Sequence, residues 1–273
     1  MSYATLMVYV DTDRMPEERV SLAARLAAQF NAALIGLSAI AIGPPVAAEG
    51  MIIAETSAAE IKEIRAKLAE KGNWFRNIAG AVHRNVEWRS VLDFPTGALV
   101  REARIADLVV IGQHASSGDD YSSLDPGRVV LKVGRPTLVV PEGVSVLRAD
   151  HIVIGWKDTR EARRAVRDAL PLFREATRIS IVEICAPGEE GAAQEHMNDV
   201  VRYLNRHRII GGPRIILHRD RSGAALLIRL AQEEGADLLV TGAYGHSRLG
   251  EGIFGGVTHE LLATSPICCL MSH

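Results

Sequence analysis

The sequence predicts an α/β protein with two tandem, doubly wound domains, each a five-stranded parallel sheet flanked by helices. Short runs rich in Val, Ile and Leu, such as TLMVYV and ADLLVTG, are too continuously apolar for half-exposed strands. They indicate parallel strands buried on both faces. Amphipathic segments such as EERVSLAARLAAQF separate these runs and indicate helices. Because the same order of runs occurs twice, the chain is predicted to be one domain duplicated.

The duplication is clearest toward the end of each half. ADLVVIG and ADLLVTG begin 130 residues apart, at Ala106 and Ala236, and Pro136 and Pro266 keep this offset. The starts of the halves, TLMVYVD and HIVIGWK, are instead offset by 146 residues, so the first half is about 16 residues longer. The surplus fits a loop over AIGPPVAAEG and the long helix AAEIKEIRAKLAEKGNWF.

Each half is predicted to follow the order β-α-β-α-β-α-β-α-β. Strands are expected near residues 5–10, 33–40, 85–91, 107–112 and 136–140, and then near 151–156, 178–184, 213–218, 237–242 and 266–271. The boundary between domains 1–145 and 146–273 is expected within PEGVSVLRAD, residues 141–150. Such a sheet places its ligand crevice at the carboxyl ends of the strands, where the strand order reverses.

Charge and composition narrow the class of protein. The formal net charge of −2 gives no reason to expect a nucleic-acid partner. No stretch reaches about 18 uncharged apolar residues, and the start lacks the basic and apolar regions of a signal peptide, so no membrane association is expected. The chain has three cysteines, none at a metal-binding spacing, which fits a reducing compartment. We therefore expect a soluble, cytoplasmic protein.

Residues 241–258, TGAYGHSRLGEGIFGGVT, contain two overlapping glycine spacings. Gly250, Gly252 and Gly255 spell the dinucleotide-binding pattern G-x-G-x-x-G, which should follow the first strand of a βαβ unit. Here it follows a late strand, and only one helix and one strand remain after it. Gly242, Gly245 and Gly255 spell G-x2-G-x9-G, and this spacing fits its surroundings better.

The second spacing predicts a phosphate-binding loop. Gly242 ends a buried strand, Gly245 lies in the turn that follows, and Gly255 and Gly256 precede the apparent helix VTHELLATS. Loop amides and a helix N-terminus would then point into one space, which suits a phosphate. The same glycines are equally compatible with a tight turn and a close contact between helix and sheet.

At this point the chain resembles the universal stress protein family, and its duplicated form resembles the tandem members. The resemblance covers both halves and rests on ADLLVTG, AYGHSRLGEGIFGG and the closing helix and strand. It implies a Rossmann-like, adenine nucleotide alpha hydrolase-like fold in which G-x2-G-x9-G, followed by Ser or Thr, cradles ATP phosphates. It also implies an Asp after the first strand that contacts the adenine or ribose side, and pairing of domains through their last strands.

The second half departs from the family pattern at two positions. Gly256 stands where Ser or Thr is expected, and Thr258 could supply the hydroxyl instead. Lys157 replaces the Asp; it could pair with phosphate but cannot accept a hydrogen bond. The loop residues His246 and Arg248 could contact a ligand or be solvated. The candidate ligand-binding residues are therefore Lys157, Gly242, Gly245, His246, Arg248, Gly255, Gly256, Val257 and Thr258.

The first half keeps the family Asp but lacks the later glycines, the reverse of the second half. Asp11 occupies the family Asp position and Gly112 matches the first glycine, but Ala115, Asp125 and Pro126 occupy the later positions. The loop SSGDDYSSLDPG carries three acidic residues that would repel a triphosphate, and proline removes a backbone donor. Nucleotide binding is therefore expected in the second half, and the first-half site is expected to be degenerate.

No catalytic residue is predicted. The motifs H-E-x-x-H, G-x-S-x-G and G-x4-G-K-[ST] are missing, and no residue resembles a general base beside the glycines. We expect a binding and regulatory protein of the stress response that takes ATP, with Mg²⁺, or AMP, and is at most a slow ATPase. The alternative is a protein with vestigial sites that acts through dimerisation or partner contacts.

Three further expectations concern the remaining features. Cys268 and Cys269 are expected to act as small apolar residues in the last strand. The mixed-charge runs KEIRAKLAEKG and REARRAVRD are expected to form solvated helix surfaces. The chain could form a homodimer, or the two halves could pair as a pseudo-dimer within one chain.

Overall fold

The computed structural model describes residues 2–43, 46–48, 51–54, 56–113, 119–217, 223–245 and 256–273. All ten predicted strands are present, with ends within two residues of those expected. They are β1 (Thr5–Tyr9), β2 (Ala33–Ala39), β5 (Val86–Val91), β6 (Leu108–Gly112), β7 (Thr137–Val140), β8 (His151–Trp156), β9 (Arg178–Cys185), β10 (Gly212–Leu217), β11 (Leu238–Gly242) and β12 (Cys268–Ser272).

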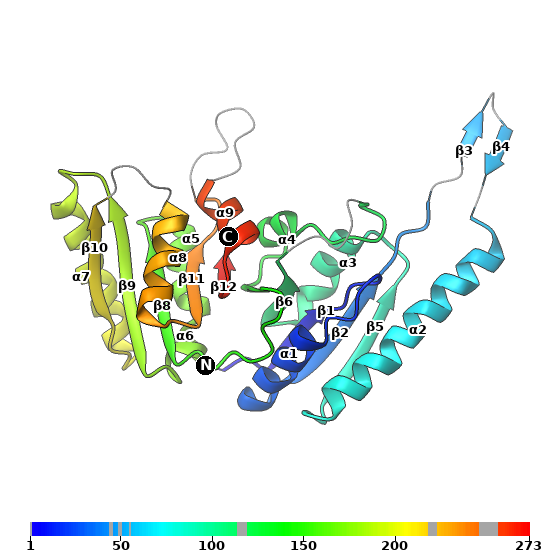
Figure 1. The fold of residues 1–273 in the computed structure, drawn as a ribbon, viewed down its shortest axis with the longest axis horizontal. Helices are drawn as coiled ribbons and strands as arrows, with labels where there is room; N and C mark the ends of the chain where they lie inside the picture. Colours follow the sequence, from blue (N-terminus) through cyan, green and yellow to red (C-terminus); the bar gives the residue numbers. More distant parts are fainter. Residues whose placement is uncertain are drawn as a thin grey trace.

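These strands form one ten-stranded sheet in the order β10-β9-β8-β11-β12-β7-β6-β1-β2-β5 (Figure 1). Strands from the same half are parallel to each other, and both halves have the same internal order. The two halves join through their last strands, because β12 pairs antiparallel with β7 and Leu270 lies opposite Leu138. The predicted α/β class and the last-strand pairing within one chain are confirmed.

Helices connect the strands. They are α1 (Glu17–Phe30), α2 (Ala58–Gly80), α3 (Pro95–Glu102), α4 (Pro126–Lys132), α5 (Arg160–Asp168), α6 (Leu170–Phe173), α7 (Glu190–Arg206), α8 (Gly223–Glu234) and α9 (Gly256–Thr264). Local side chains fix several helix starts, as their residue types predict. Ser57 and Glu60 form a capping box before α2, and the Thr159 hydroxyl accepts a hydrogen bond from the Ala162 N–H at α5.

Each face of the sheet carries its own apolar layer. Side chains of α1, α2, α5, α6 and α7 pack with one face, around residues such as Val8, Phe75 and Ile154. Side chains of α3, α4, α8 and α9 pack with the other face, around residues such as Val109 and Leu239. The inner strands are therefore buried on both sides, which explains their continuously apolar sequences.

One predicted loop is wrong in part. Within AIGPPVAAEG, Val46–Ala48 forms strand β3, which pairs antiparallel with β4 (Met51–Ala54). This pair is a separate two-stranded sheet, and Figure 1 shows it projecting away from the main sheet near the start of α2. The composition of the segment predicts a loop because it carries no alternating pattern, whereas the strands arise from pairing with MIIA immediately downstream. The long helix predicted for the extra residues of the first half is confirmed as α2.

Each half of the sheet has a switch point, the place where the order of its strands reverses. In the first half β1 lies between β2 and β6, and in the second half β8 lies between β9 and β11. Residues 141–150 connect β7 to β8. No helix in the described ranges combines the length and apolar character needed to cross a bilayer.

Candidate functional site

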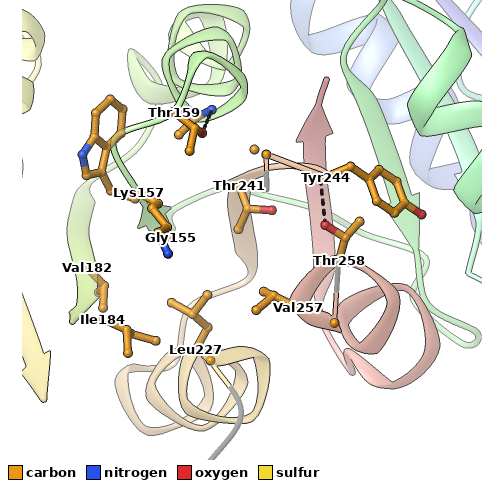
Figure 2. Close-up of a pocket in the computed structure, with 16 residues that line it drawn as sticks. Gly155, Lys157, Thr159, Val182, Ile184, Leu227, Thr241, Tyr244, Val257 and Thr258 are labelled. Atoms are coloured by element: carbon orange, nitrogen blue, oxygen red, sulfur yellow. Dashed lines mark hydrogen bonds between the residues drawn. The ribbon is translucent and has the colours of Figure 1, made fainter. Parts of the chain in front are cut away.

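A pocket of about 360 Å³ opens at the carboxyl ends of β8 and β11, at the second-half switch point. Its lining comes from the end of β8, the start of α5, β9, the start of α8, the loop after β11 and the start of α9. Figure 2 shows these segments surrounding one space. This is where a doubly wound sheet is expected to bind a ligand.

The floor and one wall of the pocket are apolar. Gly155 forms part of the floor, where there is no room for a side chain. A Cβ at this position would lie only 2.9 Å from both Leu227 Cδ1 and Thr241 Cγ2. Val182 and Ile184 of β9 and Leu227 of α8 form the wall (Figure 2). A flat, apolar ring system could lie against this wall, since small-molecule sites are mostly apolar with a few placed polar groups.

The opposite side of the pocket is polar and cationic. Lys157 follows β8, and Figure 2 shows its side chain directed into the space. Lys157 is exposed, and in the described part of the chain its ammonium has no carboxylate partner. The first turn of α9 begins at Gly256 on the far side of the pocket. An ammonium group and the N–H groups of a helix start both favour an anion.

The structure brings together every candidate residue that it describes. Lys157, Gly242, Gly245, Gly256, Val257 and Thr258 all line this pocket. His246, Arg248 and Gly255 lie outside the described residues.

The glycines of the loop serve different purposes. A Cβ on Gly242 would lie 2.5 Å from the Ala162 nitrogen and 2.7 Å from the Glu161 carbonyl carbon. The missing side chain of Gly242 therefore lets the first turn of α5 pack closely against the end of β11. This is the close contact between helix and sheet with which the glycines were also compatible from the sequence. A Cβ on Gly245 would lie 3.0 Å from Glu161 Oε2, which is also tight. At Gly256, by contrast, a Cβ would meet no atom of the described residues within 4 Å.

Thr258 joins the loop to α9. Its hydroxyl oxygen accepts a hydrogen bond of 3.1 Å from the Tyr244 N–H (Figure 2). Tyr244 has a φ of 57°, a left-handed conformation that non-glycine residues seldom adopt. The bond helps to hold this turn against the helix, so Thr258 supports the loop as well as lining the pocket. Val257 lies beside it at the pocket rim and is 42% exposed.

Glu161 is a residue at this site that the sequence analysis missed. Its side chain is only 4% exposed and its carboxylate lies against Gly245. Burial raises the pKa of Glu161, but the hydrogen bond from Arg160 and nearby charges outweigh burial and leave the pKa below its usual value. The expectation of a solvated surface for REARRAVRD is thus wrong at this position. The available signal was its place in the first turn of a helix that follows a strand at the switch point.

A titratable pair lies next to the pocket, on the other face of β9. His196 Nδ1 of α7 is 3.1 Å from Glu183 Oε1, and Glu183 is the register neighbour of Trp156. Burial raises the pKa of Glu183, and its other carboxylate oxygen has no hydrogen-bond partner within the part of the chain that the structure describes. The bond with Glu183 raises the pKa of His196. Asp158, Lys157 and Glu195 are the other charged groups that act on this pair.

The corresponding place in the first half is filled by side chains. Arg19 of α1 forms an ion pair with Asp11, and both residues are buried. The Arg19 guanidinium lies directly over Gly112, in the space that a Cβ on this glycine would enter. The remaining cavity has a volume of about 180 Å³. In the second half, a Cβ on Gly242, the counterpart of Gly112, would instead meet Glu161 and Ala162 of α5.

Three hydrogen bonds hold the described part of the acidic loop of the first half, residues 119–125. Ala41 donates a backbone hydrogen bond of 2.8 Å to the Tyr121 carbonyl, and Thr12 donates from its hydroxyl to the Ser122 carbonyl at 3.3 Å. The Asp125 N–H donates to the Thr96 hydroxyl at 3.1 Å. Ala115, one of the positions compared in the sequence, lies outside the described residues.

The cysteines lie in the interior, as expected from the sequence. Cys268 and Cys269 are buried within β12, and burial raises the pKa of each thiol to about 12. A thiol with so high a pKa is not a reactive nucleophile at neutral pH. Their part in the fold is to pack as small apolar side chains.

Fold and pocket together define an α/β protein with a ligand site at a topological switch point. Residues 148–273 match the model of the universal stress protein family. A universal stress protein from Archaeoglobus fulgidus DSM 4304 is 12% identical, with 98% of this chain and 95% of that chain covered and a TM-score of 0.74. The fold is therefore shared over nearly the whole chain.

Two other solved structures are similar. A functionally unknown protein from Pseudomonas aeruginosa PAO1 is 12% identical, with 99% of this chain and 92% of that chain covered and a TM-score of 0.60. A universal stress protein in complex with cAMP is 24% identical over 52% of this chain and 100% of that chain; its TM-score of 0.37 is too low to bear on the ligand of this protein. The comparison with curated proteins gives no significant match.

Proposed function

We propose that the second-half pocket binds an adenine nucleotide, ATP or AMP, and that the chain is a cytoplasmic binding and regulatory protein of the stress response. The observation that carries this proposal is the division of the pocket into an apolar wall and a cationic, helix-start side. A purine base needs the first and a phosphate needs the second. The word stress rests on family likeness alone.

Each part of a nucleotide has a matching part of the pocket. The base would lie against Val182, Ile184 and Leu227, and the phosphates would lie near Lys157 and the first turn of α9. Mg²⁺ would enter with ATP, bound to its phosphates. Among the described residues no group of three or more His, Cys, Asp or Glu is placed to hold a metal ion by itself.

The same geometry favours binding over turnover. Among the described residues, the Glu161 carboxylate lies close to the glycine loop, but it is buried behind Gly245 and engaged by Arg160. A general base must reach the water or hydroxyl that it deprotonates. We therefore assign no catalytic residue, and hydrolysis of ATP would be slow at most.

The two halves are proposed to have different tasks. We assign residues 1–145 and 146–273 to two domains, with the nucleotide in the second. The filled Arg19–Asp11 site and the fastened acidic loop support a structural task for the first. No nucleic-acid or membrane partner is proposed.

Isothermal titration with ATP and with AMP tests the proposal. The expected dissociation constant is tighter than about 100 μM. Lys157→Ala should weaken ATP binding about tenfold and AMP binding less, because the ammonium contacts phosphate. Lys132→Ala removes an exposed lysine of α4 in the first half and should leave binding unchanged. Flat heats at high protein concentration with both nucleotides would rule out the nucleotide site.

A second candidate function is a structural or interaction protein that binds no nucleotide. It is favoured by Gly242, whose missing side chain accommodates α5, and by the lack of a hydroxyl at Gly256. Such a protein would act through partner contacts or homodimerisation. Mass analysis of small molecules that copurify with the protein separates the two functions: a bound adenine nucleotide supports the first, and none, together with flat titrations, supports the second.

A further inference from the structure

The two outer strands of the sheet differ in how their free edges are protected. β5 and β10 are the terminal strands, and among the described strands each pairs on one side only (Figure 1). β10 carries Pro213, which has no N–H to offer to another strand. β5, with the sequence VEWRSV, has no proline. Every residue of β5 therefore carries a backbone N–H, and those that face the free edge can bond to a further strand.

The register of β5 tells which backbone groups face that edge. Leu34 N–H donates to the Asn85 carbonyl and Ile40 N–H donates to the Val91 carbonyl, at 2.9 and 3.1 Å. Odd-numbered residues of β5 therefore bond to β2. Because bonding alternates along a strand, Trp88 and Ser90 turn their N–H and carbonyl groups to the free edge.

A groove lies along this edge, between β5 and α2. It has a volume of about 600 Å³ and is lined by Trp88, Ser90 and Leu92 on the strand side and by Arg65, Asn73 and Arg76 on the helix side. We call it the β5–α2 groove. The Trp88 ring is fixed at its base, 5.4 Å from the Phe75 ring and against Gly72, where a Cβ would lie 2.6 Å from the indole nitrogen.

The helix side of the β5–α2 groove is positively charged. Arg65 and Arg76 are exposed, and within the described residues neither has a carboxylate partner. Arg76 donates a hydrogen bond to the Asn73 side-chain oxygen, at 3.1 Å. The two arginines are eleven residues apart on α2, about 16 Å along a helix axis. An extended chain covers that distance in about five residues.

We propose that the β5–α2 groove binds an extended, acidic segment of a partner protein, which adds to β5 as an outer strand. Main-chain hydrogen bonds to Trp88 and Ser90 supply affinity that does not depend on sequence. Every second side chain of the segment faces α2, where Arg65 and Arg76 select acidic residues. This surface is separate from the nucleotide pocket, which lies in the other half of the chain.

Charge excludes a second copy of this chain as the occupant. Antiparallel pairing of β5 with its own copy would place the two α2 helices side by side on the same face of the sheet. Arg65 and Arg76 of one copy would then face arginines of the other, and like charges at a contact are unfavourable. An acidic partner meets the same arginines with complementary charge.

A pair of peptides tests the proposal. A fluorescent octapeptide of alternating Thr and Glu is compared with one of alternating Thr and Lys, by anisotropy at low salt. We expect the acidic peptide to bind at least about tenfold more tightly. The charge reversal Arg65→Glu/Arg76→Glu should abolish this preference. A matched reversal on α7, Arg202→Glu/Arg206→Glu, should keep it, and circular dichroism checks the fold of each variant.

Strand addition has its own signature in amide hydrogen exchange. Saturating acidic peptide should slow exchange at Trp88 and Ser90, whose N–H groups face the edge, and leave Arg89 unchanged. Ser90→Pro removes one of these donors while keeping both arginines, and should weaken binding at least about fivefold. Equal affinity for both peptides, or binding without protection of Trp88 and Ser90, overturns the proposal. So does a dimer of the peptide-free protein that protects the same amides.

Discussion

The guanidinium of Arg19 lies against the carboxylate of Asp11, and the two side chains together occupy the crevice of the first half. Asp11 is the residue that family resemblance assigns to ligand contact. In this chain its carboxylate is already engaged by a cation from α1. The first half thus has a crevice at the same position in its sheet as the second half. In the first half, the Arg19 side chain occupies the space beside Asp11 and Gly112.

Removing the cation of this pair should unfold the protein more easily. Arg19→Ala leaves a buried carboxylate without its partner, which we expect to lower the free energy of unfolding by about 3–5 kcal/mol. Urea unfolding at neutral pH measures the change. The double variant Arg19→Ala/Asp11→Ala should recover much of the loss because no charge remains buried. A single variant as stable as the wild type would show that the pair contributes little.

Restoring the family hydroxyl at Gly256 should strengthen nucleotide binding. Among the described residues no atom lies within 4 Å of a Cβ at this position, so Gly256→Ser should fold normally. Its hydroxyl can donate to a phosphate at the start of α9, a charge-assisted bond that should tighten ATP binding about tenfold. Titration against the wild type measures the effect. Gly245→Ser is the contrasting variant, because its Cβ would crowd Glu161 Oε2 at 3.0 Å. Unchanged affinity in Gly256→Ser would argue that no phosphate lies there.

The buried carboxylate beside the loop should limit affinity for highly charged ligands. Glu161→Gln keeps the shape of the side chain and removes its negative charge. We expect ATP to bind about fivefold more tightly and AMP to gain less, because repulsion grows with ligand charge. Titrations with both nucleotides in the same buffer give the ratio. An equal gain for the two ligands would assign the effect to packing and not to charge.

The His196–Glu183 pair should make stability depend on pH. The pKa of His196 is raised by its bond to Glu183, so charged His196 stabilises the folded state. That contribution is complete below the unfolded-state pKa of about 6.5 and is lost as the pH rises through the higher folded-state pKa. The stability advantage of the wild type over His196→Gln should therefore be larger at about pH 5.5 than at about pH 8.5. Urea unfolding at both pH values checks this; an advantage that grows with pH would contradict it.

Much of the fold could be predicted because its strands are buried on both faces. Runs such as ADLVVIG have no polar alternation, and burial in a parallel sheet requires this. The 130-residue offset then equated Gly112 with Gly242. The hairpin of β3 and β4 could not be predicted in the same way, because it lies outside the main sheet and its strands have no periodic pattern.

The site could be placed from the sequence, but its charges could not. The described candidates from Lys157 to Thr258 meet at one pocket because they follow β8 and β11, which are neighbours at the switch point. Arg19 and Glu161 both lie in the early turns of amphipathic helices, where charged residues usually face water. Only the packing of α1 and α5 against the sheet buries them. Sequence spacing gives the position of a residue along a helix and does not give what its side chain touches.

The antiparallel contact between β7 and β12 joins two halves of the same plan inside a single polypeptide. In a symmetric homodimer any substitution appears twice, once in each crevice, so neither site can change alone. Fusion removes that restriction. One crevice contains a buried salt bridge while the other keeps an open cavity, and the two can differ because each is encoded separately. Covalent linkage thus allows this protein to be asymmetric.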